Sequence, residues 1–286
     1  MHIGRAVLLG AVAIQIIAPT LIAKPQTLHE VPVVTCAQGS SQKVLLRSTE
    51  RLPEASGVAR VGRMGGTTDI EVQVDSMKPA SLFGGDYNTF VLWVVPPRGQ
   101  AQNLGELSLD GGQARIRAAT SATTFALLVT AEPHYLVSQP SAFIVLQSKA
   151  DRNNQTLELP LVEGVYNFSR STLANVQRAK GQVHSEIPQA FTAVRLAQRA
   201  GAASLARVEL SRAQASLQKA IALWQEHADR NQIVAQALET VRLAVAAQRL
   251  AEDRALQETR LGPEGLGGGK IESEGRDLRD TQNRWR

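Results

Sequence analysis

The side chains that could carry out chemistry are scattered along this sequence rather than grouped. Its five histidines are His2, His29, His134, His184 and His227. No two of them are four residues apart, the spacing that places two ligands on one face of a helix. The single cysteine, Cys36, cannot form the cysteine pair of a zinc site. We therefore expect no metal site.

Four carboxylates lie at predicted strands or turns: Glu71, Asp86, Glu106 and Glu132. Glycoside hydrolysis, for example, needs two carboxyl groups at a set separation, and nothing in this spacing selects a pair. We interpret His134 as a turn histidine at the end of a strand, with a ligand contact as the alternative. No nucleophile-elbow signature is present. We expect no catalytic residues and no enzymatic activity.

The glycine-rich run from Gly265 to Lys270 is superficially similar to a phosphate-binding loop. It departs from that motif at Glu264, where glycine is needed, and at Ile271, where serine or threonine is needed. No strand is predicted before it. We therefore expect no nucleotide and no other cofactor.

The net charge of +5 lies in the second part of the chain. Residues 1–164 hold 13 basic and 13 acidic side chains, and residues 165–286 hold 18 and 13. No cluster of lysine and arginine with interleaved aromatic residues accompanies this excess, so we expect no nucleic-acid partner. A weak positive field of this kind favours an anionic lipid or polymer instead.

The amino-terminal segment predicts export. Arg5 precedes an uncharged run from Ala6 to Ala23, and Lys24 follows it. This pattern is typical of a secretory signal, so we expect residues 1–23 to be a signal peptide cleaved after Ala23. The alternative is an uncleaved anchor, because 18 residues span about 27 Å as a helix. That segment would be the chain's contact with a membrane.

Cys36 allows no intrachain disulfide, because it has no partner. Lipidation would require a small residue before the cysteine and an apolar run leading directly to it. Thr35 precedes it instead, so we expect Cys36 to be buried at the end of a short strand.

Short apolar runs separated by glycine, proline and aspartate predict β-strands between Val31 and Gln147. The expected strands are Val31–Cys36, Val44–Arg47, Gly57–Val61, Thr68–Asp75, Thr89–Val95, Leu104–Leu109, Ala114–Thr120, Thr124–Thr130 and Ala142–Gln147. Asp110-Gly111-Gly112 predicts a hairpin between the strands on either side of it. Phe90–Val95 is apolar on both faces, as a central strand would be, and we expect Trp93 to fill the gap between two sheets. Strands at this spacing predict an immunoglobulin-like antiparallel β-sandwich over residues 31–150.

Several segments of this region resemble a β domain of bacterial envelope proteins: Gly57–Ala59, Thr68–Val74, Leu82–Tyr87, Phe90–Pro97, Asn103–Leu107 and Leu128–Tyr135. In those proteins the domain often precedes a helical segment and an OmpA-like peptidoglycan-binding domain. The resemblance covers about Gly57 to Gln147 and implies a location in the envelope and an architecture. It implies no activity. We assign no peptidoglycan-binding domain to the sequence that follows.

Residues 165–260 predict an Ala-rich helical domain. Leu157, Leu159 and Leu161 alternate as one more strand before it. A first helix is expected from Ser169 or Ser171. Further helices are expected over Ser185–Ala200, Ala206–Glu226 and Gln232–Thr259.

The limits of these helices follow from particular residues. Ser185 is a candidate cap and Pro188 lies in the first turn that follows it. Gly201 is the expected stop of that helix. One stripe holds Leu210, Ala213, Leu217, Ala220, Ile221 and Trp224, and the next holds Val234, Leu238, Val241 and Val245.

Short connections predict an antiparallel hairpin or three-helix bundle, with possible coiled-coil packing. Arg195–Gly201 and Glu209–Ala213 resemble an Ala-rich helical family of the bacterial envelope. Residues 261–286 are rich in glycine and charge, and we expect a disordered tail.

The sequence thus predicts an α+β multidomain protein of the periplasm or cell envelope. The first functional hypothesis is a non-catalytic structural or interaction protein whose partner is an envelope protein or a cell-wall component. The second is a helical adaptor, or periplasmic subunit, of a secretion or efflux assembly. The third is an enzyme with an unrecognised site.

Overall fold

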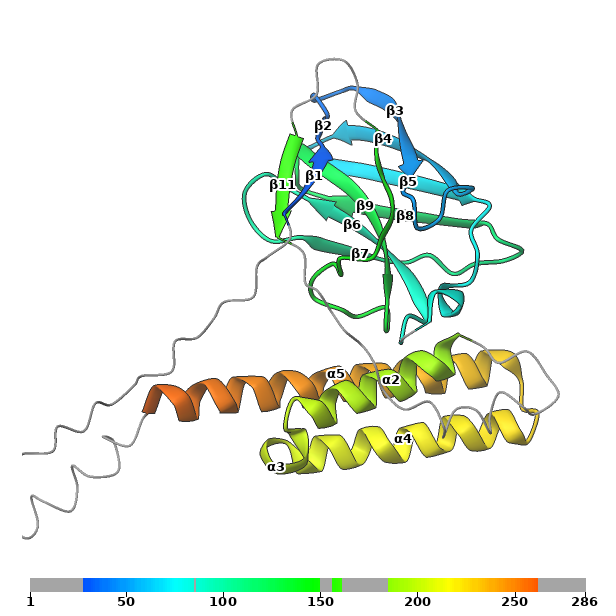
Figure 1. The fold of residues 1–286 in the computed structure, drawn as a ribbon, viewed down its shortest axis with the longest axis vertical. Helices are drawn as coiled ribbons and strands as arrows, with labels where there is room; N and C mark the ends of the chain where they lie inside the picture. The colour runs from blue at the N-terminus through cyan, green and yellow to red at the C-terminus, as the bar shows by residue number, and fades with distance from the viewer. Residues whose placement is uncertain (1–27, 85, 150–155, 161–184, 262–286) are drawn as a thin grey trace, which may run out of the picture.

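The computed structural model describes residues 28–84, 86–149, 156–160 and 185–261. Its first part is a mostly antiparallel β structure that is nearly barrel-shaped, and its second part is helical (Figure 1). This arrangement confirms the α+β class. The strands are β1 (Leu28–Pro32), β2 (Val34–Thr35), β3 (Ser41–Ser48), β4 (Ser56–Met64), β5 (Thr67–Asp75), β6 (Thr89–Val95), β7 (Gln102–Glu106), β8 (Ala114–Thr120), β9 (Thr124–Glu132), β10 (Ile144–Ser148) and β11 (Thr156–Pro160), with a 3-10 turn η1 (Ala80–Phe83).

The main sheet runs in the order β7-β6-β9-β10-β3-β4-β5-β8, and β2 pairs with β9. Its two end strands, β7 and β8, approach each other and nearly close the sheet. The Thr120 hydroxyl on β8 donates to Gln102 Oε1 on β7 at 2.6 Å. A Cβ on Gly105 would lie 2.9 Å from Ile116 Cδ1, and its φ of 125° also requires glycine. The near-closure therefore depends on a position that has no side chain.

The Asp110 turn forms as predicted, but the predicted hairpin is wrong. Asp110 and Gln113 exchange backbone hydrogen bonds of 2.8 and 2.9 Å around two glycines of positive φ. The flanking strands then separate, because β7 pairs with β6 and β8 pairs with β5. A local turn signal does not report which neighbours a strand chooses once the sheet assembles.

Trp93 lies between two sheets, as predicted, but the second sheet consists of β1 and β11. Alternation along β6 sends Phe90, Leu92 and Val94 into the core of the β structure. Val91, Trp93 and Val95 face the opposite side and pack there with Val31 of β1, with half-buried Leu157 of β11 against them. Strands β1 and β11 form a separate two-stranded sheet. The predicted strand Val31–Cys36 is therefore split: β1 pairs with β11 and β2 pairs with β9.

Cys36 is 2 % exposed, as expected for a buried thiol. The predicted strand over Leu157–Leu161 corresponds to β11, of which residues up to Pro160 are described. The expected helix near Ser169 lies outside the described residues, as do residues 1–27 and the tail from 262.

The helices are α2 (Glu186–Arg199), α3 (Ala202–Leu205), α4 (Arg207–Gln225) and α5 (Arg230–Leu261). They follow the predicted spans within two residues, apart from the four-residue α3, which was not predicted. Gly201 adopts the left-handed conformation (φ 85°) that ends α2, as predicted. The prediction that Ser185 caps α2 is wrong, because the Ser185 backbone is already helical and its side chain makes no capping hydrogen bond.

Helices α2, α4 and α5 lie side by side beneath the β structure (Figure 1). Alanines fill much of their shared core and allow close approach, and the predicted α4 stripe is buried at Leu210, Ala213, Leu217 and Ala220. The α5 stripe is centred one residue earlier than predicted, on Ile233, Ala237, Val241 and Ala244, with Val234 and Leu238 only half-buried. The buried stripe of α5 is shifted because this helix contacts both α2 and α4.

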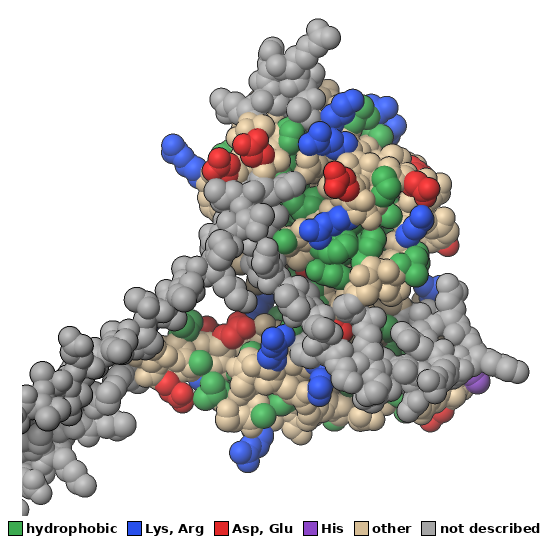
Figure 2. All heavy atoms as spheres, in the orientation of Figure 1, with side chains coloured by type: hydrophobic (Ala, Val, Ile, Leu, Met, Phe, Trp, Pro, Cys, Tyr) green, Lys and Arg blue, Asp and Glu red, His purple; other side chains and the backbone are tan. Residues whose placement is uncertain are grey.

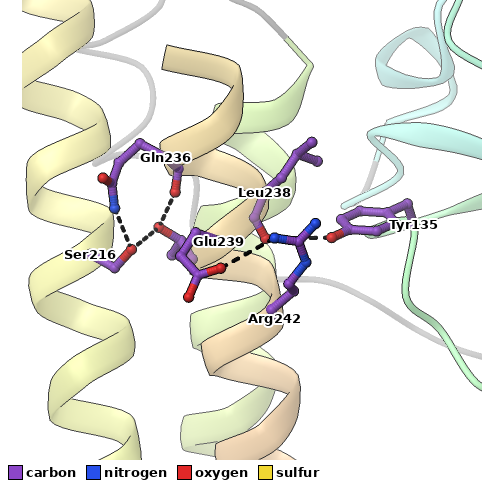
Figure 3. Close-up of polar contacts among 7 residues, drawn as sticks. Tyr135, Ser216, Gln236, Leu238, Glu239 and Arg242 are labelled. Atoms are coloured by element: carbon purple, nitrogen blue, oxygen red, sulfur yellow. Dashed lines mark hydrogen bonds and ion pairs between the residues drawn. The ribbon is translucent and has the colours of Figure 1, made fainter. Parts of the chain in front are cut away.

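A buried polar contact fixes the register of α4 against α5 (Figure 3). The Ser216 and Thr240 hydroxyls lie 2.8 Å apart, and Gln236 Nε2 donates to Ser216 Oγ at 2.7 Å. Thr240 also donates to the Gln236 carbonyl at 2.9 Å. These bonds satisfy polar groups that would otherwise be buried without partners. Within the described ranges, no helix is both long enough and apolar enough to cross a membrane.

Candidate functional site: a polar seam between the strands and the helices

Polar side chains from the β structure and from α2 meet in a buried layer, which we call the polar seam. It consists of Asn88, Glu106, Tyr135, Gln189 and Thr192. Gln189 is fully buried, and Thr192 is 1 % exposed. Buried polar groups are costly unless they are hydrogen-bonded, so the partners of each one matter.

Gln189 joins two segments of the β structure to α2. Its Nε2 donates to Glu106 Oε1 at 2.7 Å, and its Oε1 accepts from the Tyr135 backbone N–H at 2.9 Å. Both ends of one amide are therefore used. The Thr89 hydroxyl donates to the same Glu106 oxygen at 2.5 Å.

Asn88 makes the second link, from the residue just before β6. Its Nδ2 lies 3.0 Å from Thr192 Oγ1 and 2.9 Å from the Pro133 carbonyl. The same nitrogen lies 3.4 Å from the Pro188 carbonyl, in the first turn of α2. This amide therefore ties the start of β6, the end of β9 and α2 together.

Tyr135 extends the seam to α5 (Figure 3). Its hydroxyl donates to the Leu238 carbonyl at 3.4 Å. Burial raises the pKa of the tyrosine hydroxyl, which is opposed by nearby Arg242. Arg242 is in turn paired with Glu239 at 3.2 Å on the surface of α5. The ring of Tyr135 also packs against the helical core.

Glu132 lies on the same face of the sheet as Glu106, on the other side of Thr89. Thr89 is directly opposite Glu132 in the β6–β9 pair, and it hydrogen-bonds Glu106. The Glu132 carboxyl is fully buried. Its Oε1 accepts from the Ser141 N–H at 2.7 Å and from the Thr130 hydroxyl at 2.5 Å. Its Oε2 has no hydrogen-bond partner among the described residues.

Burial raises the pKa of Glu132 to about 7, although the hydrogen bonds from Ser141 and Thr130 oppose the shift. Burial also raises the pKa of Glu106, against hydrogen bonds from Thr89 and Gln189, and Glu186 adds to the rise. The charged form of each carboxyl is disfavoured because protein solvates it less well than water does.

His134 is 3 % exposed, and burial together with the positive charge of Arg249 lowers its pKa to about 4. The imidazole is therefore neutral at neutral pH. Its Nδ1 has no hydrogen-bond partner among the described residues. The expectation of a turn histidine is right about its place after β9, but this side chain is packed inside the protein.

Of the residues considered from the sequence, Glu106 is hydrogen-bonded to α2 and His134 is within range of the charge of Arg249 on α5. Glu132 shares the sheet face of Glu106. The structure places Glu71 elsewhere, on the exposed face of β5. Asp86 is buried close to the seam, where its carbonyl accepts from Asn88. No cluster of three or more potential metal ligands occurs in the part of the chain that the structure describes.

Sequence reasoning missed Asn88, Gln189 and Thr192. A usable signal was present at α2, where Gln189 and Thr192 are interleaved with Ile187, Ala190 and Ala193 on the buried face. A polar residue on an apolar stripe is the mark of a buried hydrogen bond to another element.

The carboxyls of Glu106, in the polar seam, and of Glu132, beside it, suit a structural role better than turnover. A raised pKa often marks an acid or base of an active site, but structural networks raise pKa values too. Glu132 is fully buried and Glu106 is packed between Thr89 and Gln189. Glu106 accepts from Gln189 of α2 and so links the strands to the helices, whereas Glu132 accepts from Thr130 and Ser141 within the β structure.

Replacing Gln189 by leucine should lower the free energy of unfolding by about 2–4 kcal/mol, because it leaves Glu106 and the Tyr135 N–H each short of a buried partner. Urea unfolding followed by circular dichroism measures the loss. The matched control is Gln218→Leu on α4, where the side chain is exposed and the change should stay within about 0.5 kcal/mol. Equal effects at both positions would contradict the role of the polar seam.

No protein-family model matches this chain, and no curated protein matches its sequence.

Proposed function

We propose that this chain is a non-catalytic, exported cell-envelope protein with a structural or interaction role. The observation that carries the proposal is the polar seam. Its polar groups hydrogen-bond across the junction between strands and helices, at distances of 2.7 to 3.0 Å. Such a junction holds two bodies in a set orientation, as a protein that presents surfaces to partners requires. The uncharged run Ala6–Ala23 supports export.

The strand order supports the immunoglobulin-like part of the proposal. In that fold, strands A, B and E share one sheet, and strands C, F and G share the other. Counted in chain order from β4 to β10, strands β4, β5 and β8 take the places of A, B and E, and β6, β9 and β10 take those of C, F and G. The seven-strand form also places strand D beside E, so it requires five pairings. Four of them occur, and β7, in the place of D, pairs with β6 rather than with β8.

The helices support a role in binding a partner. Helix α5 continues past the helices that cover its first part (Figure 1). From Glu252 to Arg260 its side chains are exposed, apart from half-buried Ala255. Leu256, in this extension, is 57 % exposed. A helix that protrudes from its own bundle offers an apolar side chain to another helix.

Fractionation of the native protein, followed by amino-terminal sequencing, tests the location. A start at Lys24 in the periplasmic fraction is the expected result, and an intact Met1 in the membrane fraction would indicate the anchored form of the same exported protein. Recovery from the cytosol with Met1 intact would contradict the proposal.

The second candidate is a helical adaptor of a secretion or efflux assembly, which the α5 extension favours. A pull-down on purified sacculi separates the two. Retention by sacculi supports attachment to the cell wall, whereas co-purification of one membrane complex supports the adaptor. Leu256→Glu should abolish co-purification of the membrane complex and leave retention by sacculi unchanged.

A further inference from the structure

The outward face of strands β3, β4, β5 and β8 carries a group of cations. Cross-strand register places Lys43, Arg60, Glu71 and Arg117 in one row across the four strands. Arg115 lies two residues from Arg117 on β8 and therefore shares this face. We call this surface the basic face. Figure 2 shows basic and acidic side chains interspersed with apolar ones over the visible side of the β structure.

One carboxylate gathers three guanidinium groups on the basic face. Glu71 Oε1 lies 2.9 Å from Arg117 and 4.0 Å from Arg115, and its Oε2 lies 3.8 Å from Arg60. Hydrogen bonding by Arg117 is the main cause of a lowered pKa at Glu71, so this carboxyl is ionised at neutral pH. Asp69 lies two residues from Glu71 on the same face of β5. The four cations Lys43, Arg60, Arg115 and Arg117 therefore exceed these two carboxylates by two charges.

Arg60, Glu71 and Arg117 border a shallow hollow of about 340 Å³, which Ser41 and Asp69 also help to line. The three arginine side chains are 60–80 % exposed, so they can turn toward a ligand. Guanidinium groups bind phosphate through paired hydrogen bonds as well as charge. The basic face therefore fits phosphate-bearing anions.

Two large apolar side chains accompany the cations. Leu45 lies two residues from Lys43 on β3 and is 46 % exposed, and Met64 lies at the tip of the β4–β5 hairpin and is 77 % exposed. Alternation from Lys43 to Leu45 on β3, and from Arg60 through Gly62 to Met64 on β4, puts both apolar side chains on the basic face. Cations with nearby exposed apolar side chains suit a lipid surface, where the charges meet headgroups and the apolar groups enter the acyl boundary. A soluble anionic polymer would leave the apolar groups unused.

We propose that the basic face docks on a bilayer surface that carries anionic phospholipid headgroups, with Arg60, Arg115 and Arg117 around the phosphates. This contact is separate from the amino-terminal segment and does not depend on the protein being non-catalytic.

Co-sedimentation of the full-length chain with vesicles tests the proposal. The readout is the ratio of the partition coefficient on phosphatidylglycerol-containing vesicles to that on pure phosphatidylcholine vesicles, because any insertion of the amino-terminal segment contributes to both. Arg60→Gln with Arg117→Gln should lower the ratio about 25-fold at low salt, since each basic residue near an anionic membrane contributes about a 5-fold gain. High salt should remove most of the wild-type preference.

Three further variants make the test specific. Arg212→Gln with Lys219→Gln removes the same charge from exposed positions on α4 and should leave the ratio unchanged. Glu71→Gln should raise the ratio about 5-fold, because a negative charge leaves the surface. Leu45→Thr with Met64→Thr should weaken binding at equal charge.

Equal losses from the basic-face and α4 pairs would overturn the proposal, because binding would then follow net charge alone. It would also be overturned if soluble polyphosphate bound the chain while vesicles did not. Circular dichroism of each variant checks that it is folded, and export results from fractionation remain independent of every outcome.

Discussion

Glu132→Gln should be about 3 kcal/mol more stable than the wild type at pH 8 and close to it at pH 4. Burial raises the pKa of Glu132 from its ordinary value of 4.5 to about 7. A carboxyl of raised pKa contributes stability that is fully present below about pH 4.5 and is lost as pH rises through about 7. Glutamine keeps the shape of the neutral acid and carries no charge at any pH, so the variant escapes the loss.

Urea unfolding at pH 4, 6 and 8 measures this difference. Glu252→Gln, on the exposed end of α5, is the matched control and should follow the wild type at every pH. If Glu132→Gln were instead destabilised equally at pH 4 and pH 8, the carboxyl would be ionised throughout, which contradicts its burial without a charge partner.

His134→Gln should remove a pH dependence of stability that is opposite in direction to that of Glu132 and similar in size. Burial and Arg249 lower the pKa of His134 from 6.5 to about 4. A histidine of lowered pKa contributes stability that is fully present above about pH 6.5 and is lost as pH falls through about 4, with a full cost of about 3 kcal/mol. The stability of the variant relative to the wild type should therefore rise by about 3 kcal/mol as the pH falls from 7 to 4.

His227→Gln is the control, because His227 is exposed in the turn before α5. The two buried groups act in opposite directions over the same pH interval, so the wild type should show little net slope from them. The Glu132 variant alone should then lose stability toward acid, and the His134 variant alone should lose it toward base. Parallel curves for the two variants would contradict the assignment.

Much of the fold follows from local patterns in the sequence. Alternation in Asp69–Val74 predicts β5, and glycine at 201 predicts the end of α2, because both signals act within a few residues. Trp93 shows where such reasoning ends. Both faces of β6 are apolar, and the sequence does not say that β1 and β11 cover the second face. The choice of partners by β7 and β8 is likewise a property of the assembled sheet.

The polar seam was less predictable than the fold. Glu106, Glu132 and His134 could be noted as titratable groups, but their surroundings include segments far away in the sequence, and the charge that acts on His134 is that of Arg249, 115 residues away. Asn88 and Gln189 have no chemical signature of their own. They matter because each amide meets partners from another part of the chain, and a single sequence does not report such pairs.

The fixed orientation of helices and strands is best tested by a distance between two spin labels. Labels at Ser121→Cys on the β structure and Gln218→Cys on α4, in a Cys36→Ser background, give this distance from exposed sites. One narrow distance population is expected, and Gln189→Leu should broaden it. A broad distribution in the protein with an intact polar seam would contradict the claim that buried amides and carboxyls lock the two parts together.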